Sequence, residues 1–195
     1  MIYDMLDFLK SFGAVRKFKK TNIPEKIINK ILESGNWGFS ILGVQPWNFV
    51  CIKNRKILNK LANVLVDNSY KIPRTLQIIV GITATTLKNS AVVIAIYNNK
   101  KVSQRLKKYG KSYSERGHMA ELQCIGGSIQ NMCLESNLLG LGCVWIDSPN
   151  FFEREINTIL DEEGELIAFL VLGYPNESPH RSKRSMNIAT FKRLY

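Results

Sequence analysis

One uninterrupted run of apolar, largely β-branched residues, Ala91–Tyr97, constrains the fold of this 195-residue chain more than any other segment. Such a run is expected of a strand that is buried on both faces of a sheet. Shorter segments rich in β-forming residues predict three further strands, at Trp47–Ile52, Gly142–Ile146 and Leu166–Gly173. The sequence therefore predicts a small sheet whose core strand is covered on both sides.

Apolar residues at helical spacing predict helices in most of the remaining chain. Asn22 is expected to cap one helix, with Pro24 near its first turn and Gly35 as its stop. The longest candidate, Glu115–Leu139, is apolar on more than one side and is expected to be the central buried helix, followed by Gly140 as its C′ glycine. Further helices are expected at residues 2–12, 55–66, 72–87 and 152–160.

Helices and strands interleave without the regular βαβ spacing of a doubly wound fold, and no glycine-rich phosphate loop follows a strand. The predicted class is α+β, with a small mixed or antiparallel sheet flanked by helices. The length and the 45% apolar content suit a single domain with a real core.

The compartment is inferred from the cysteines and the apolar stretches. No apolar stretch reaches the ~20 residues that a membrane span needs, and the N-terminus MIYDMLDFLK carries two aspartates where a signal peptide would be basic. Cys51, Cys124, Cys133 and Cys143 lie in apolar segments without CxxC spacing, so we expect buried, reduced thiols. A cytoplasmic protein without a membrane partner is expected.

The formal net charge of +11 attracts anions of any kind, including nucleic acid, lipid headgroups and phosphorylated cofactors. No nucleic-acid-binding module is recognisable, so no nucleic-acid partner is expected. Only two histidines are present and none of the usual zinc or P-loop motifs occurs, so no metal site is expected. His118 has Glu115 and Glu121 three residues to either side; this triad is either an acid–base or ligand group or, as we favour, the polar face of a surface helix.

Three short segments allow a functional as well as a structural reading. Gln45-Pro46-Trp47 stands at the mouth of the first strand, where Pro46 stiffens the backbone beside the Gln45 amide. The segment LLGLGCVW, residues 138–145, reads as a helix stop followed by a strand, or as a backbone that passes close to a flat ligand. The basic clusters RKFKK and HRSKR could converge on one phosphate, with Arg16, Lys183 and Arg184 as its ligands, or could be solvated surface.

The joint order of these segments resembles a known family. VRKFKKTNIPEKIINKILESGNW, QPWNFVCI, SAVVIAIY, SIQNMCLESNLLGLGCVWI and LIAFLVLGYPNESPHRSKRSM, in this order, are similar to the nitroreductase superfamily of FMN-dependent oxidoreductases. The resemblance implies a single nitroreductase-like domain over residues 1–195 and an intertwined homodimer with FMN sites built from both chains. It also implies that residues 174–195 form a C-terminal extension that reaches the partner subunit.

The resemblance also implies which residues bind the cofactor. Arg16, Lys183 and Arg184 match the phosphate-binding positions, Ser40 and Gln45 match positions beside the flavin, and Gly140-Leu141-Gly142 match a backbone wall over it. The chain departs from the family pattern at five positions near the expected cofactor: Gly13, Ala14, Ile41, Leu42 and Gly43. The backbone N–H groups of residues 40–43, those of Ile41 and Gly43 included, are expected to reach the flavin ring.

The implied activity is electron transfer from NADH or NADPH through FMN to a nitroaromatic, quinone or similar acceptor by a ping-pong mechanism. No catalytic side chain is implied, because the chemistry resides on the cofactor. The departures leave open an alternative, a flavin-binding protein of the same fold with little or no reductase turnover.

Overall fold

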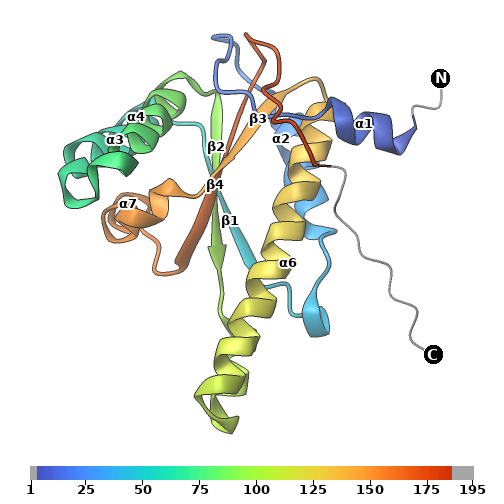
Figure 1. Ribbon diagram of the computed structural model, residues 1–195, viewed down its shortest axis with the longest axis vertical. Helices are drawn as coiled ribbons and strands as arrows, with labels where there is room; N and C mark the ends of the chain where they lie inside the picture. Colours follow the sequence, from blue (N-terminus) through green and yellow to red (C-terminus); the bar gives the residue numbers. More distant parts are fainter. Residues whose placement is uncertain (1–3, 186–195) are drawn as a thin grey trace.

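The computed structural model describes residues 4–185 (Figure 1). In this part of the chain four strands form one sheet in the order β1-β2-β4-β3, with every neighbouring pair antiparallel. The strands are β1 (Trp47–Ile52), β2 (Val92–Asn98), β3 (Gly142–Ile146) and β4 (Glu165–Gly173). The predicted α+β class is confirmed, and each predicted strand forms within one residue of its expected bounds.

Every predicted helix is also present, although the bounds differ by up to a turn. The α-helices are α1 (Met5–Ser11), α2 (Glu25–Asn36), α3 (Arg55–Asp67), α4 (Arg74–Asn89), α5 (Lys101–Leu106), α6 (Lys111–Leu138) and α7 (Glu153–Leu160). Short 3₁₀ turns complete the described chain: η1 (Ile41–Gly43), η2 (Ser69–Lys71), η3 (Lys107–Tyr109) and η4 (Ser148–Phe152). None of the described helices combines the length and the apolar composition needed to cross a bilayer.

Strand β2 is buried along its whole length, as its composition predicts. Its alternate side chains enter two separate cores: Val93, Ala95 and Tyr97 pack toward α3, α4 and α7, whereas Val92, Ile94 and Ile96 pack toward α2 and α6. Figure 1 shows these helix groups on opposite sides of the sheet. The sheet is therefore the middle layer of three.

The structure corrects two predicted details of the helices. Helix α2 begins only at Glu25, after Pro24 in the N-cap position, and Asn22 does not cap it. Gly35 is not the stop that the sequence predicted: it lies inside this helix and packs against α6. The helix ends at Asn36. Gly140 does take the C′ position of α6: its φ of 75° suits glycine, and the N–H of Leu141 closes the turn on the Ser136 carbonyl at 2.9 Å.

A third correction concerns the thiols. All four cysteines are free, as expected, but only Cys124, Cys133 and Cys143 are buried. Cys51 is exposed, because it points out of the edge strand β1.

Two segments distant in sequence run antiparallel beside the end of β4 (Figure 1). Ala14 and His180 exchange backbone hydrogen bonds of 3.1 and 2.8 Å, and Phe18 pairs with Pro175. The N–H of Val15 donates to the Cys143 carbonyl at 2.9 Å, which ties the N-terminal segment to β3. The N-terminal and C-terminal basic clusters are thereby brought to one end of the sheet.

Candidate functional site

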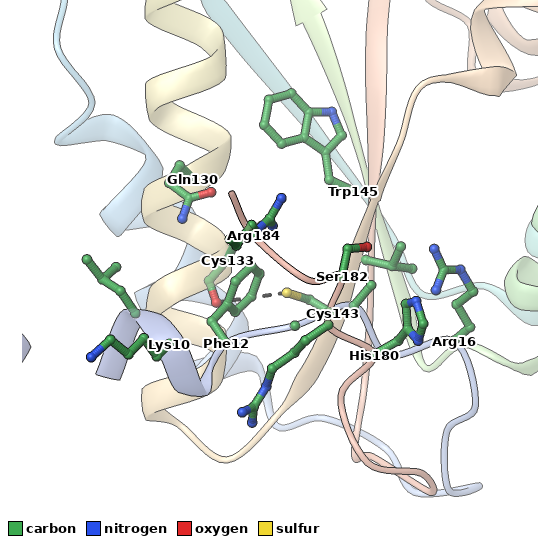
Figure 2. A pocket seen from close by; sticks show the side chains of 15 residues that line it. Lys10, Phe12, Arg16, Gln130, Cys133, Cys143, Trp145, His180, Ser182 and Arg184 are labelled. Atoms are coloured by element: carbon green, nitrogen blue, oxygen red, sulfur yellow. Dashed lines mark hydrogen bonds between the residues drawn. The ribbon is translucent and has the colours of Figure 1, made fainter. Parts of the chain in front are cut away.

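The paired segments enclose a cavity of about 660 Å³, which we call the Arg16 cavity (Figure 2). Its walls are α1, the following loop, one face of α6, strand β3 and the C-terminal segment. The lining residues are Leu9, Lys10, Phe12, Gly13, Ala14, Arg16, Gln130, Cys133, Cys143, Val144, Trp145, His180, Arg181, Ser182 and Arg184. The volume lies in the range of small-molecule and cofactor sites.

The Arg16 cavity is strongly cationic. Lys10, Arg16, Arg181 and Arg184 contribute positive side chains, and no carboxylate occurs among the described lining residues. Arg16 makes no salt bridge with another described residue, so its guanidinium is available to a ligand. Guanidinium groups bind phosphate oxygens in a bidentate manner. The charge pattern therefore suits a phosphorylated ligand.

Gly13 explains how the C-terminal segment can lie so close. A Cβ atom at this position would stand 2.6 Å from the His180 carbonyl oxygen and 3.0 Å from Cγ of Arg181. No side chain fits there without a shift of the backbone. The space that a larger residue would fill is taken by the stem of Arg181, which brings a cation of the C-terminal segment against the N-terminal segment.

Glu177 holds the backbone of Arg16 in place. Its Oε1 accepts hydrogen bonds from the N–H of Arg16 at 2.6 Å and of Lys17 at 3.0 Å. The bond from the Arg16 N–H, aided by the N–H and the charge of Lys17, holds the pKa of the Glu177 carboxyl below its usual value. The carboxylate is therefore ionised at neutral pH and braces the segment without occupying the Arg16 guanidinium.

Two further cavities adjoin the first, because Arg16 and His180 line all three. One, of about 470 Å³, lies between β3 and helix α4, whose residues Ile79 and Ile82 are each 50% exposed. Trp145 lines both this cavity and the Arg16 cavity and is 44% exposed. A cationic site thus borders a half-exposed apolar wall, which is the arrangement that a ligand with a charged tail and a flat ring would use.

A hydrogen bond links Cys133 and Cys143, the two cysteines of the Arg16 cavity. The Cys143 thiol lies 3.8 Å from the Cys133 carbonyl oxygen, to which it donates. The hydrogen bond with Cys143, and then burial, raise the pKa of the Cys133 thiol well above its usual value. A thiol that keeps its proton does not attack substrates, so the Cys133 thiol is not a nucleophile at neutral pH.

The predicted flavin-contacting residues Ser40, Ile41, Gly43 and Gln45 lie elsewhere. They belong to a loop of residues 39–45, here called the Gln45 loop, that leads into β1. Trp47 pairs with Asn98 at one end of β2, whereas the Arg16 cavity lies at the other end, where Val92 pairs with Leu172. Within one chain, the structure therefore does not bring this loop to Arg16 and Arg184.

The Gln45 loop has an unusual backbone conformation that local hydrogen bonds hold in place. Leu42, Gly43 and Gln45 have φ values of 51°, 65° and 49°, a region that residues other than glycine seldom adopt. The N–H of Gln45 donates to Ser40 Oγ at 2.7 Å, and the Gln45 carbonyl accepts from Asn99 at 2.8 Å.

Two backbone donors of this loop are already used. The N–H of Ile41 donates to Cys124 Sγ at 3.3 Å, and that of Gly43 donates to the Ser40 carbonyl at 3.2 Å. Both N–H groups belong to those expected to reach the flavin ring, and in the single chain each has an intrachain acceptor. Outside these bonds the loop is apolar and open to solvent, with Phe39 82% and Leu42 80% exposed.

Some predicted site residues do not line the Arg16 cavity in the described part of the chain. Leu141 is buried in the core, and Gly142 packs tightly against Val15. The next three residues, 143–145, line the Arg16 cavity, whereas residues 140–142 do not. Lys183 is exposed and absent from the lining, whereas Arg181 belongs to it. Arg181, Trp145 and the α4 isoleucines line these cavities but were not predicted as site residues from the sequence. For Trp145 the available signal was a tryptophan that faces outward from a strand.

The predicted polar face around His118 is only partly a surface. Glu121 is fully buried, and its Oε1 accepts from the N–H groups of Val102 at 2.6 Å and Ser103 at 3.0 Å. His118 Nε2 lies 3.3 Å from Oε1 of Glu165. Among the described residues no cluster of three or more His, Cys, Asp or Glu side chains is arranged to hold a metal ion. Glu121 is therefore a structural carboxylate that fixes the start of α5.

This fold and the placement of the basic clusters define a class of protein. The sequence model of the nitroreductase family matches residues 13–174, so the chain belongs to the nitroreductase family. The match covers β1 to β4 and most of the residues around the Arg16 cavity.

Individual relatives agree with this assignment. The chain is 27% identical over 180 residues to a protein of Methanothermobacter thermautotrophicus named "Putative NADH dehydrogenase/NAD(P)H nitroreductase", which covers 90% of this chain and 80% of the relative. It is 25% identical to a BluB-like flavoprotein from Clostridium difficile 630, whose crystal structure superimposes with a TM-score of 0.79 over 97% of this chain and 99% of that one. An FMN-dependent nitroreductase from Clostridium difficile R20291 shares the fold, with a TM-score of 0.69 and 17% identity over 97% and 100% of the two chains.

Proposed function

We propose that the protein is an FMN-dependent oxidoreductase that takes electrons from NADH or NADPH and passes them to a nitroaromatic, quinone or similar acceptor by a ping-pong mechanism. Family membership and the relatives' names support this assignment. The observation that carries it is the Arg16 cavity, which joins four cations and no carboxylate to the exposed Trp145.

The residues present fit the cofactor. Arg16, Arg181 and Arg184, with Lys10, would hold the phosphate of FMN through charge-assisted hydrogen bonds. Compared with the family motif, Phe12 and Gly13 replace two basic residues and Ala14 replaces a serine, but the close approach at Gly13 admits Arg181 in return. Lys183 has a smaller part in this proposal than the sequence suggested, since it is exposed and does not line the cavity.

When bound, FMN supplies the two-electron chemistry. The chain's own part is to bind and orient the cofactor and to place positive charge near it. Glu177 keeps the Arg16 segment in position, and Trp145 with Ile79 and Ile82 offers an apolar wall that excludes water from one side of a flat ring. An apolar wall beside fixed cations strengthens the electrostatic interactions of the site.

We propose that the complete site needs two chains. The Arg16 cavity and the Gln45 loop lie at opposite ends of β2 in one chain, so only a second copy could place Ser40 and Gln45 beside the cofactor. The exposed Trp37, Phe39 and Leu42 are suited to such a homodimer contact. We further propose that residues 1–195 are one domain whose extension, residues 174–195, contacts the partner; residues 186–195 lie outside the described part of the chain.

One purification tests the function. The expected result is a yellow dimer whose flavin absorbance near 450 nm disappears on anaerobic addition of NADH or NADPH and returns when a quinone is added. A yellow dimer that neither nucleotide bleaches would instead be a flavin-binding protein with little turnover, which the occupied N–H groups of Ile41 and Gly43 make the second candidate. A colourless protein that does not take up FMN would exclude both.

A further inference from the structure

Residues 100–116 form a strongly basic surface, which we call the basic tip. The segment comprises α5, η3 and the first turn of α6, at the end of α6 that projects beyond the sheet in Figure 1. Seven exposed cations stand there against the single carboxylate of Glu115. The cations are Lys100, Lys101, Arg105, Lys107, Lys108, Lys111 and Arg116.

The basic tip is a built structure and not a loose charged loop. The buried carboxylate of Glu121 accepts from the N–H groups of Val102 and Ser103, and Ser114 Oγ donates to the Ser103 carbonyl at 3.0 Å. Asn98, at the end of β2, donates to both Glu121 and Glu165 at 3.2 and 3.1 Å. The backbone that carries the cations is thus held by hydrogen bonds to buried groups.

Few of these charges are neutralised within the chain. Lys100 lies 3.5 Å from Glu165, and Lys111 lies 3.7 Å from Glu115. Lys101, Arg105 and Lys107 make no salt bridge with any other described residue. A rigid cluster of unpaired cations produces a positive potential that attracts phosphate groups.

Exposed aromatic rings accompany the charges. Tyr109 and Tyr113 are 61% and 56% exposed and meet edge to face with ring centroids 6.2 Å apart. The Lys108 ammonium stands 4.9 Å from the centroid of Tyr109. Aromatic faces next to cations are suited to a ligand that carries both bases and phosphates.

The basic tip begins where the Gln45 loop ends. The N–H of Asn99 donates to the Pro46 carbonyl and its side chain donates to the Gln45 carbonyl, both at 2.8 Å. Gln45 and Lys101 line one groove of about 490 Å³. A ligand that meets the Gln45 loop is therefore within reach of the first cations of the tip.

We propose that the basic tip binds the phosphate groups of the nicotinamide dinucleotide donor and favours the form with a 2′-phosphate, NADPH. The inference rests on the proposed function, in which the Gln45 loop borders the flavin that the donor must reach. A dinucleotide whose nicotinamide enters there has to leave its pyrophosphate and adenosine outside, toward the tip. The 2′-phosphate adds negative charge, so an unpaired cation cluster discriminates it from a free hydroxyl.

A triple variant that replaces three cations by neutral glutamine tests this proposal on the FMN-loaded protein. Lys101→Gln, Arg105→Gln and Lys107→Gln remove three of the cations without a salt bridge to another described residue. As a matched control, Lys56→Gln, Lys60→Gln and Lys88→Gln, on α3 and α4, remove three exposed lysines on the other side of the sheet. Binding of NADP⁺ and NAD⁺ is measured by titration calorimetry, together with FMN content and the KM for each donor.

For the tip variant we expect NADP⁺ to bind roughly tenfold more weakly, the loss associated with one charge-assisted hydrogen bond, with NAD⁺ affected much less. FMN content and kcat should match those of the wild type, and the control variant should bind NADP⁺ normally. The preference of the wild type for NADP⁺ should also shrink as salt is added.

Equal loss of NADP⁺ binding in the tip and control variants would overturn the proposal, as would a wild type that binds NADP⁺ and NAD⁺ equally. A tip variant that loses only affinity for duplex DNA would overturn it in favour of a polyanion site. Absence of FMN from the wild-type protein is a separate result: it removes the proposed function and the inference with it, whereas FMN-loaded protein with unaltered NADP⁺ binding removes the inference alone.

Discussion

The two ends of strand β2 differ in how complete they are. At one end the Arg16 cavity is assembled from five segments of one chain, tied by the Ala14–His180 backbone pair and by Glu177. At the other end the Gln45 loop is strained, with three positive φ values in four residues, and it leaves Phe39 and Leu42 in solvent. The Arg16 end thus has a complete set of cations for an anion, whereas the apolar side chains of the Gln45 loop are uncovered in the single chain.

This difference separates two properties that a cofactor site needs. In the proposed site, binding of the phosphate depends on charges that a single chain supplies, whereas enclosure of the ring depends on apolar surface at the opposite end of the chain. The predictions below address these properties separately, because variants at one end should leave the other intact.

The largest effect is expected when the apolar end is charged. The double variant Phe39→Asp/Leu42→Asp should weaken the homodimer about 1000-fold, since each residue is a candidate interface anchor worth about 2 kcal/mol or more. The monomer should still fold, because both side chains are about 80% exposed in the single chain. Analytical ultracentrifugation measures the change.

The matched control is Tyr70→Asp/Phe151→Asp, which charges exposed aromatics among the helices on the opposite face of the sheet. It should remain dimeric. If the control dissociates into monomers and the Gln45-loop variant does not, the dimer interface lies on the α4 side. The proposal that a partner chain covers the Gln45 loop would then be wrong.

The second prediction concerns the cationic end. Replacing both Arg16 and Arg184 by Ala should weaken FMN binding about 100-fold or more, because each removes a charge-assisted hydrogen bond worth about 1.5–3 kcal/mol. Flavin absorbance per chain and the Kd from fluorescence quenching give the result. Lys20→Ala, which removes an exposed cation outside the cavity lining, should bind FMN normally; unchanged retention in the double variant would mean that the phosphate lies elsewhere.

The third prediction tests the rigidity of the basic tip. Glu121→Ala should lower the free energy of unfolding by about 2–3 kcal/mol, because it leaves the buried N–H groups of Val102 and Ser103 without an acceptor. Glu115→Ala, an exposed glutamate on the same helix, should change it by no more than about 0.5 kcal/mol. Urea denaturation compares them, and similar losses in both variants would show that Glu121 is no anchor.

The fold could be predicted from the spacing of apolar residues because that spacing reflects which faces of a helix or strand are buried. Ala91–Tyr97 predicted a strand buried on both faces, and its alternate residues do enter two cores. The pattern failed for Glu121, which looks like a surface residue in the sequence. Its burial depends on α5, a six-residue helix that has no helical periodicity of its own to reveal it.

The site was predicted less completely, for two physical reasons. Which residues of an irregular segment line a cavity depends on tertiary contacts that the sequence does not show, and here Arg181 lines the Arg16 cavity and Lys183 does not. Glycines also drew attention to residues 140–142, although Gly140 ends a helix and Gly142 accommodates Val15. The lining comes from the three residues that follow, whose alternation in β3 exposes Trp145.

The smallest effect is expected at Glu177, and it should depend on pH. Glu177→Gln keeps the shape of the side chain but removes its charge, so at pH 7 it should cost about 0.5–1 kcal/mol of stability, part of the strength of the two bonds from Arg16 and Lys17. Because the pKa of this carboxyl is lowered in the folded state, its contribution is present above the usual glutamate pKa of about 4.3 and is lost as the pH falls through the lower folded value.

Thermal unfolding of the wild type and of Glu177→Gln should therefore differ at pH 7 and converge as the pH is lowered below about 4. Glu163→Gln, at an exposed carboxylate, should track the wild type throughout. FMN retention should follow the same profile with a smaller amplitude, because Glu177 acts on the cofactor site only through the backbone of Arg16. A Glu177→Gln difference that stays constant down to pH 3 would mean that the side chain contributes by its shape alone and that its charge does not brace the Arg16 cavity.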